Sequence, residues 1–119
     1  MHSFQTNTVK HDNLVELICT GTLTLDESVK LGEQLRYEIS KEPSIDRALV
    51  DVSHAKVKID IMHRFMLGEY IAKNLLDLKI AIVADADVID KMVEDTAVNR
   101  GASLYVTCDR LDALNWLSE

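Results

Sequence analysis

The sequence has 119 residues, of which 47% are apolar and 28% are charged, as in an ordinary soluble globular protein. That length allows one domain, which we expect to span residues 1–119, with a core that needs neither metal ions nor disulfide bonds. The formal net charge of −7 argues against binding of nucleic acids or anionic membranes, because both require a concentrated basic patch.

The two cysteines, Cys19 and Cys108, each lie in an apolar run, so we expect two reduced thiols in the core of a cytoplasmic protein. The N-terminal residues lack the apolar segment of a signal peptide. No apolar run approaches the roughly 18 residues that a membrane span needs. The sequence contains no Cys/His ligand spacing and no glycine-rich phosphate loop, so we expect no cofactor.

Two strand-like segments begin the chain. Residues 4–9 alternate weakly between apolar and polar side chains, and residues 14–20 (LVELICT) follow a turn-rich cluster at 10–13. This arrangement predicts an antiparallel hairpin at the start of a sheet, with Gly21 ending the second strand.

A helix is predicted next. Thr24 and Glu27 have the spacing of a capping box, and apolar residues then recur every three or four positions through about Lys41. Pro43, the only proline, lies in the short polar link after this helix.

The segment at 48–52 (ALVDV) is a short apolar run of the kind found in an inner strand that is covered on both faces. We expect a polar loop after it, carrying His54, Lys56 and Lys58. Open α/β sheets bind their ligands at loops that follow such strands. A ligand or partner site is therefore expected here.

A second helix is predicted from Asp60, its proposed N-cap, toward Leu75. Its apolar residues cover more than one side of the helix. This pattern indicates either a deeply buried helix or a helix whose second face contacts a partner.

The C-terminal part alternates between strands and helices. A buried strand at 79–84 precedes an amphipathic helix over 88–97, which Gly101 ends as a left-handed cap. A strand at 103–107 and a helix capped by Asp109 complete the chain. The expected order is β-β-α-β-α-β-α-β-α, which indicates an α/β fold with a mixed sheet, an N-terminal hairpin and parallel crossovers.

This order resembles the STAS-like fold of sporulation anti-sigma factor antagonists. The C-terminal third resembles the SpoIIAA-like branch, in which an apolar strand, a helix, a short strand and a closing helix recur. The matching residues are Ile80 to Ala84, Asn99, Arg100, Gly101, Asp109, Ala113, Leu114, Trp116 and Leu117.

The resemblance implies a non-catalytic regulatory domain that docks a protein partner. In the signalling members of the family, a serine at the start of the second helix is phosphorylated, and the added charge blocks docking. Here Asp60 is followed by Ile61, so that phosphoacceptor is missing.

The candidate binding site is the loop and helix start at 53–66 together with the exposed face of that helix. A helix rich in methionine and aromatic side chains can dock a protein or cover an apolar pocket, because thioethers adapt their shape. The occupant is expected to be a protein partner, a second copy of the chain, or a small apolar or lipid-like ligand. A cavity beneath Phe65 and Met66 would favour the ligand, and an exposed patch would favour a protein. The residues proposed for this site are Ser53, His54, Lys56, Lys58, Met62, Phe65, Met66 and Tyr70.

An alternative function uses Asp51, Asp60 or His63 in a phosphoacceptor or a small enzyme. Asp51 lies at the end of the expected inner strand, as a receiver phosphoaspartate does, but the acidic pair and the lysine of receiver domains are missing. The other two residues supply too few ligands for a metal site by themselves.

Overall fold

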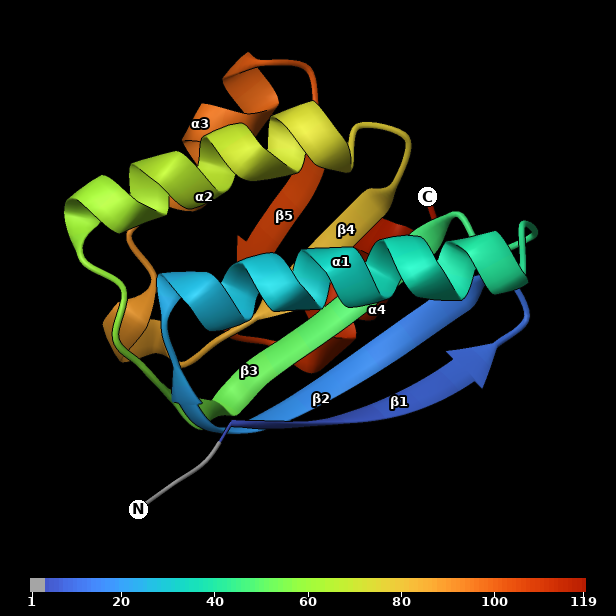
Figure 1. Cartoon of the computed structure of the whole chain (residues 1–119), viewed down its shortest axis with the longest axis horizontal. Coiled ribbons are helices and arrows are strands. Elements are labelled where there is room, and N and C mark those ends of the chain that lie inside the picture. The colour runs from blue at the N-terminus through green and yellow to red at the C-terminus, as the bar shows by residue number, and fades with distance from the viewer. Residues whose placement is uncertain (1–3) are drawn as a thin grey trace.

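The computed structural model describes residues 4–119. In this part of the chain, five strands form one sheet in the order β1-β2-β3-β4-β5 (Figure 1). β1 is antiparallel to β2, and all other neighbouring strands are parallel. The strands are β1 (Gln5–His11), β2 (Leu14–Leu23), β3 (Arg47–Val57), β4 (Lys79–Val83) and β5 (Ser103–Thr107).

Helices cover both faces of the sheet. The helices are α1 (Leu25–Lys41), α2 (Ile61–Asn74), α3 (Met92–Asn99) and α4 (Arg110–Leu117), with a short 3-10 turn η1 (Ala86–Val88). The first three lie on one face, where they enclose the larger core cluster, and α4 packs on the other. Among the helices of residues 4–119, none is long and apolar enough to cross a membrane.

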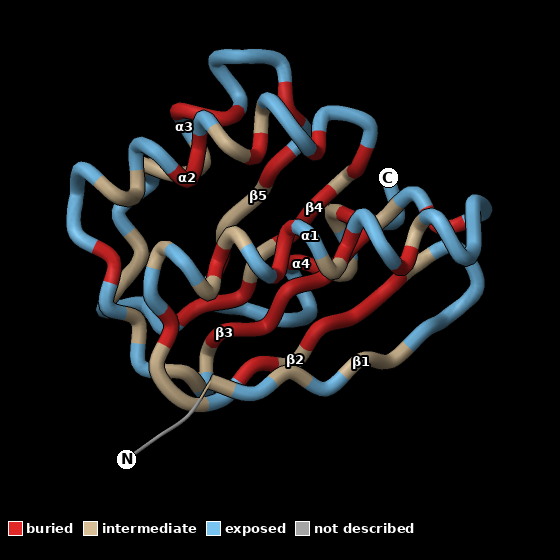
Figure 2. Tube along the Cα trace, in the orientation of Figure 1, coloured by how far each residue is buried: buried red, intermediate tan, exposed pale blue. Residues whose placement is uncertain are grey.

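The two core clusters follow the alternation of side chains along each strand. Ala48, Val50 and Val52 of β3 point toward α1 and α2, whereas Leu49 points toward α4. The buried trace runs through the middle strands in Figure 2, and β1 at the border is mostly exposed. The prediction of a central strand over 48–52, covered on both faces, is therefore confirmed.

The face under α4 holds an ion pair between a buried carboxylate and an exposed arginine. Arg110, at the start of α4, donates hydrogen bonds from both terminal nitrogens to the carboxylate of Glu16 on β2. The hydrogen bond to Glu16 raises the pKa of Arg110. A buried carboxylate requires such a partner, so this contact ties the last helix to the N-terminal half of the sheet.

β2 and β3 are longer than the sequence indicated. Gly21, expected to end β2, continues it with a φ of 90°. After an irregularity in pairing near Ile18 and Thr20, residues 20–23 pair with residues 54–57. The expectation of a polar loop carrying His54 and Lys56 was wrong, because apolar and polar residues alternate over 54–57 as a strand with one exposed face requires.

The predicted helix ends are mostly confirmed. The side chains of Thr24, Asp60 and Asp109 each accept a hydrogen bond from a main-chain N–H in the first turn of their helices. Gly101 has a left-handed φ of 96° after α3.

The helix expected over 88–97 was placed too early. It begins at Met92, after η1 and after Lys91, whose φ is 68°. The left-handed residue breaks the helical path, so Val88 and Ile89 lie in an irregular segment that packs against the core.

Only one of the two cysteines is in the core. Cys19 is fully buried on β2, and its burial raises the pKa of the thiol to about 12. Cys108 was expected in the core but is exposed, because it lies in the turn between β5 and α4.

We expect a thiol reagent such as DTNB to label Cys108 alone in the folded protein at pH 8. Cys19 is shielded and stays protonated at that pH, so it reacts only after unfolding. Absorbance of the released thiolate should give one thiol per chain in buffer and two in guanidinium chloride. Rapid labelling of two thiols in the folded protein would contradict the placement of Cys19.

We expect Gly68→Ala to lower the free energy of unfolding by about 1–2 kcal/mol, although alanine favours a helix. An added Cβ would lie 2.6 Å from Cβ of Thr96 and 2.9 Å from the carbonyl oxygen of Val93, so α2 and α3 must separate. Glu69→Ala, at the exposed neighbouring position, is the control and should change stability by less than about 0.5 kcal/mol. Urea unfolding measures both variants, and a Gly68→Ala protein as stable as wild type would refute this close packing.

Candidate functional site

α2 carries apolar side chains on two sides. Leu67, Ile71 and Leu75 are buried against the sheet. The apolar side chains of the first two turns, at positions 61–66, face away from the sheet. The first of the two sequence interpretations, a deeply buried helix, is therefore wrong: α2 is a core helix with an additional exposed apolar face.

The exposed side is named the outer patch and consists of Ile61, Met62, Phe65 and Met66. These side chains retain 65%, 66%, 36% and 45% of their accessible surface, respectively. Spacings of one, four and five positions place them on one side of a helix. Figure 2 shows the exposed start of α2 at the border of the molecule.

A charged side chain borders the outer patch. The guanidinium carbon of Arg100, at the end of α3, lies 5.3 Å from the ring centroid of Phe65. Arg100 also lies 3.6 Å from a carboxylate oxygen of Glu69 and donates to the carbonyl oxygen of Thr96 at 3.2 Å. These contacts orient the aromatic ring beside a cation that is itself held in place.

A cavity of about 120 Å³ lies beneath the inner side of α2. Its floor is formed by Val50, Ile82 and Val106, which are neighbours across three adjacent strands. Ile82 lies on the inner strand β4 beneath the helices, yet it is only partly buried, whereas Ile80 on the same strand and face is fully buried. The cavity therefore reaches the surface of the sheet.

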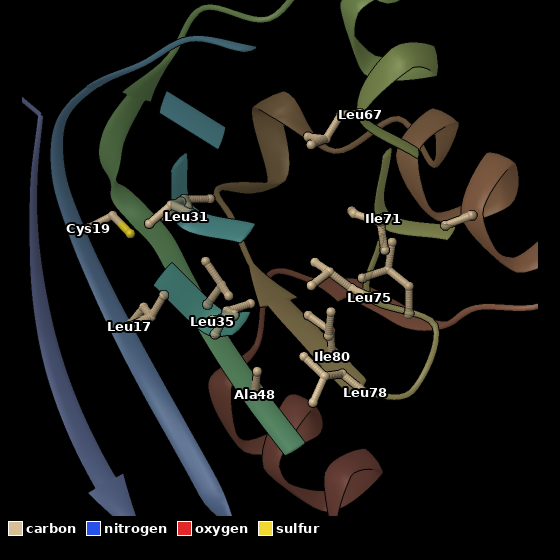
Figure 3. Close-up of a cluster of buried hydrophobic side chains, with 14 of the residues drawn as sticks. Leu17, Cys19, Leu31, Leu35, Ala48, Leu67, Ile71, Leu75, Leu78 and Ile80 are labelled. Carbon is tan, nitrogen blue, oxygen red and sulfur yellow. The ribbon is translucent and has the colours of Figure 1, made fainter. Parts of the chain in front are cut away.

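The walls of the cavity come from two helices. Leu31 and Leu35 of α1 lie on one side, and Leu67 and Ile71 of α2 on the other (Figure 3). The space between these helices is partly open to solvent, so it is not an enclosed void. The helix layer thus leaves apolar surface unpacked where a tighter core would be more stable.

Tyr70 spans the space between α1 and α2. Its hydroxyl group donates a hydrogen bond of 3.4 Å to the carbonyl oxygen of Val29. Its ring lies directly over Gly32, where an added Cβ would come within 2.5 Å of the ring edge. Partial burial raises the pKa of Tyr70. This tyrosine forms part of the cavity lining between the two helices.

The charged residues of the cavity lining lie at one end, near the carboxyl ends of the strands. There Arg64 donates hydrogen bonds to the carbonyl oxygens of Ile59 (2.8 Å) and Val88 (3.1 Å) and pairs with Asp90. Lys91 pairs with Glu94 at 3.2 Å at the same end. Each cation that lines the cavity therefore already has an anionic partner.

The residues proposed from the sequence lie in four places. Met62, Phe65 and Met66 belong to the outer patch, and Tyr70 lines the cavity. Lys58 lies in the short link between β3 and α2. Ser53, His54 and Lys56 lie on β3.

His54 and Lys56 are separated from the outer patch. Ala55 and Val57 pack against the core beneath the helices, so the alternating side chains of His54 and Lys56 point to the opposite face of the sheet. The cavity lies beneath Leu67 and Ile71, whereas a cavity beneath Phe65 and Met66 was the feature that would have favoured a ligand at the proposed site. Ile61 and Arg100 border or belong to the outer patch but were not among the residues proposed from the sequence. The adjacent apolar residues Ile61 and Met62 could have indicated the first of them.

The residues of the alternative catalytic hypothesis are held by local hydrogen bonds. The carboxylate of Asp51, on β3, accepts hydrogen bonds from the N–H (2.9 Å) and the hydroxyl group (2.6 Å) of Ser53. Asp60 caps α2 and lies 3.7 Å from the ring of His63. Asp51 shares the α4 side of β3 with Leu49, away from α2. Within residues 4–119, no three His, Cys, Asp or Glu side chains are grouped so as to hold a metal ion.

We expect Met62→Ala to change the free energy of unfolding by less than about 0.5 kcal/mol, because its side chain is mostly exposed. Leu67→Ala, five positions later on the same helix, should lower it by about 2–3 kcal/mol, since that side chain is buried in the core. Urea unfolding of both variants tests this difference. Equal losses would show that α2 does not have one exposed and one buried apolar side.

No family model matches the sequence, and no curated protein matches it by sequence. Solved structures nevertheless match along nearly the whole chain. An anti-sigma factor antagonist from Mycobacterium paratuberculosis is 15% identical, with a TM-score of 0.66 over 98% of this chain and 96% of that one. An uncharacterised protein from Shewanella loihica with a SpoIIAA-like fold is 16% identical, with a TM-score of 0.61 over 98% and 95%.

A third match is RsbS of Moorella thermoacetica, 19% identical, with a TM-score of 0.58 over 96% of this chain and 95% of that one. At these identities the matches establish architecture. The resemblance inferred from the sequence is confirmed at that level, and the chain has the SpoIIAA-like α/β fold.

Proposed function

We propose that the chain is a non-catalytic, regulatory binding domain in the cytoplasm, and that it docks a protein partner through the outer patch of α2. The observation that carries this proposal is the exposure of Ile61, Met62, Phe65 and Met66 side by side on one helix face. Single exposed apolar residues are ordinary on protein surfaces, whereas a contiguous group marks an interaction site.

The composition of the patch fits contact with a protein. Aromatic side chains, methionine and arginine are enriched at protein interfaces, and the outer patch combines Phe65 with two methionines beside Arg100. An amphipathic helix docks by laying such side chains into an apolar groove of its partner. We therefore propose a partner with an apolar groove and an acidic residue positioned to meet Arg100.

The fold supports a regulatory role of this kind, since two of the matched structures are named as an anti-sigma factor antagonist and RsbS. The sequence lacks the serine that follows the position of Asp60 in the signalling branch. Docking in this protein would therefore be controlled by something other than phosphorylation at that position.

A photo-crosslinking amino acid at position 65 tests the proposal in the cell of origin. Benzoylphenylalanine in place of Phe65 should form a crosslink to one discrete protein, identified by mass spectrometry. The same substitution at Leu111, an equally apolar position on α4 that is 66% exposed, should give none.

Adding Met62→Glu to the position-65 variant should reduce the crosslinked product about tenfold, because a buried charge in an interface costs more than 1 kcal/mol. Leu111→Glu is the matched control and should leave the yield unchanged. Equal crosslinking from positions 65 and 111, or none from either, would refute docking through the outer patch. Crosslinks to a second copy alone would show a homodimer and refute a separate partner.

A further inference from the structure

We propose that the cavity beneath α2 binds a compact, neutral, apolar molecule of about benzene's size. This site lies on the inner side of α2 and is distinct from the outer patch, so it adds a small-molecule ligand to the protein docking proposed above. This proposal rests on the volume of the cavity, the chemistry of its lining and the hydrogen bonds and ion pairs of the polar groups in that lining.

The volume sets the size of the ligand. The cavity measures about 120 Å³. An engineered cavity of about 150 Å³ lined by leucine, isoleucine and phenylalanine stays dry and takes up benzene or xenon. A single ring or a short branched chain therefore fits here.

The lining sets the polarity of the ligand. Val50, Ile82 and Val106 form the floor, and leucine and isoleucine side chains of α1 and α2 form the walls. The hydroxyl group of Ser28 donates to the carbonyl oxygen of Thr24 at 2.9 Å, so it can accept a hydrogen bond from a ligand but not donate one. Away from the hydroxyl groups of Ser28 and Tyr70, a polar group would lose its hydrogen bonds to water without replacement.

The charges at the end of the cavity favour a neutral ligand as well. Arg64 is engaged by Asp90 and by two carbonyl oxygens, and Lys91 is engaged by Glu94. In residues 4–119, the buried side-chain polar atoms without a hydrogen bond belong to Glu38, which pairs with Lys10 at 2.8 Å, and to Arg47, and neither residue lines the cavity. A carboxylate ligand would compete with Asp90 for Arg64 and with Glu94 for Lys91.

The cavity is partly open to solvent, so a small molecule can enter it from the surface. Tyr70 lines the cavity between α1 and α2, where a hydrogen bond to the carbonyl oxygen of Val29 holds its hydroxyl group and its ring packs over Gly32.

Titration of the full chain with benzene, followed by methyl NMR, tests the proposal. Benzene should shift the methyl signals of Val50, Ile82 and Val106 in a saturable manner and raise the melting temperature. Benzoate, which adds a carboxylate to the same ring, should bind at least tenfold more weakly. Benzoate binding as tight as that of benzene would overturn the assignment of a neutral ligand.

Ile82→Phe should fill the cavity and weaken benzene binding at least tenfold. Ile61→Phe makes the same chemical change on the outer patch and should bind benzene as wild type does. Val106→Phe, on the border strand β5, provides a second filling variant if Ile82→Phe does not fold. Absence of saturable shifts in wild type, or undiminished binding in a folded filling variant, would overturn the proposal. Neither outcome bears on the crosslinking at position 65.

Discussion

Two close approaches at glycine fix the position of α2. The ring of Tyr70 lies over Gly32 of α1, and Gly68 of α2 lies against Thr96 of α3. At both places an added Cβ would come closer than 3.0 Å to a neighbouring side chain. Contacts this close set the spacing of the three helices, because protein interiors are packed nearly as tightly as crystals.

The spacing of the helices determines what each side of α2 does. Leu67 and Ile71 reach toward the sheet but do not fill the space above Ile82, which leaves the cavity. The first turns of the helix extend beyond this contact region, so Met62 and Phe65 remain exposed. The proposed ligand site and the proposed docking surface are therefore opposite sides of one element, and movement of α2 would affect both.

The order of strands and helices could be predicted from the sequence, as could the caps at Asp60 and Asp109, because these features depend on residues close together in the chain. The length of β3 could not, since pairing of residues 54–57 with β2 depends on a partner more than 30 residues away. For α2, apolar residues on two sides indicated two possible environments, and only the packing of α1 and α3 decides which residues are covered. The cavity depends on the contact between Tyr70 and Gly32, which are far apart in the sequence, so no local sequence pattern predicts it.

The account depends most on α2 having one covered and one exposed apolar side. Methyl NMR in the presence of a soluble gadolinium chelate tests this directly, because the chelate accelerates relaxation only of groups that solvent reaches. The account predicts strong relaxation for the methyl groups of Ile61, Met62 and Met66 and protection for those of Leu67 and Ile71. Protection of both sets, or strong relaxation of both, would contradict it.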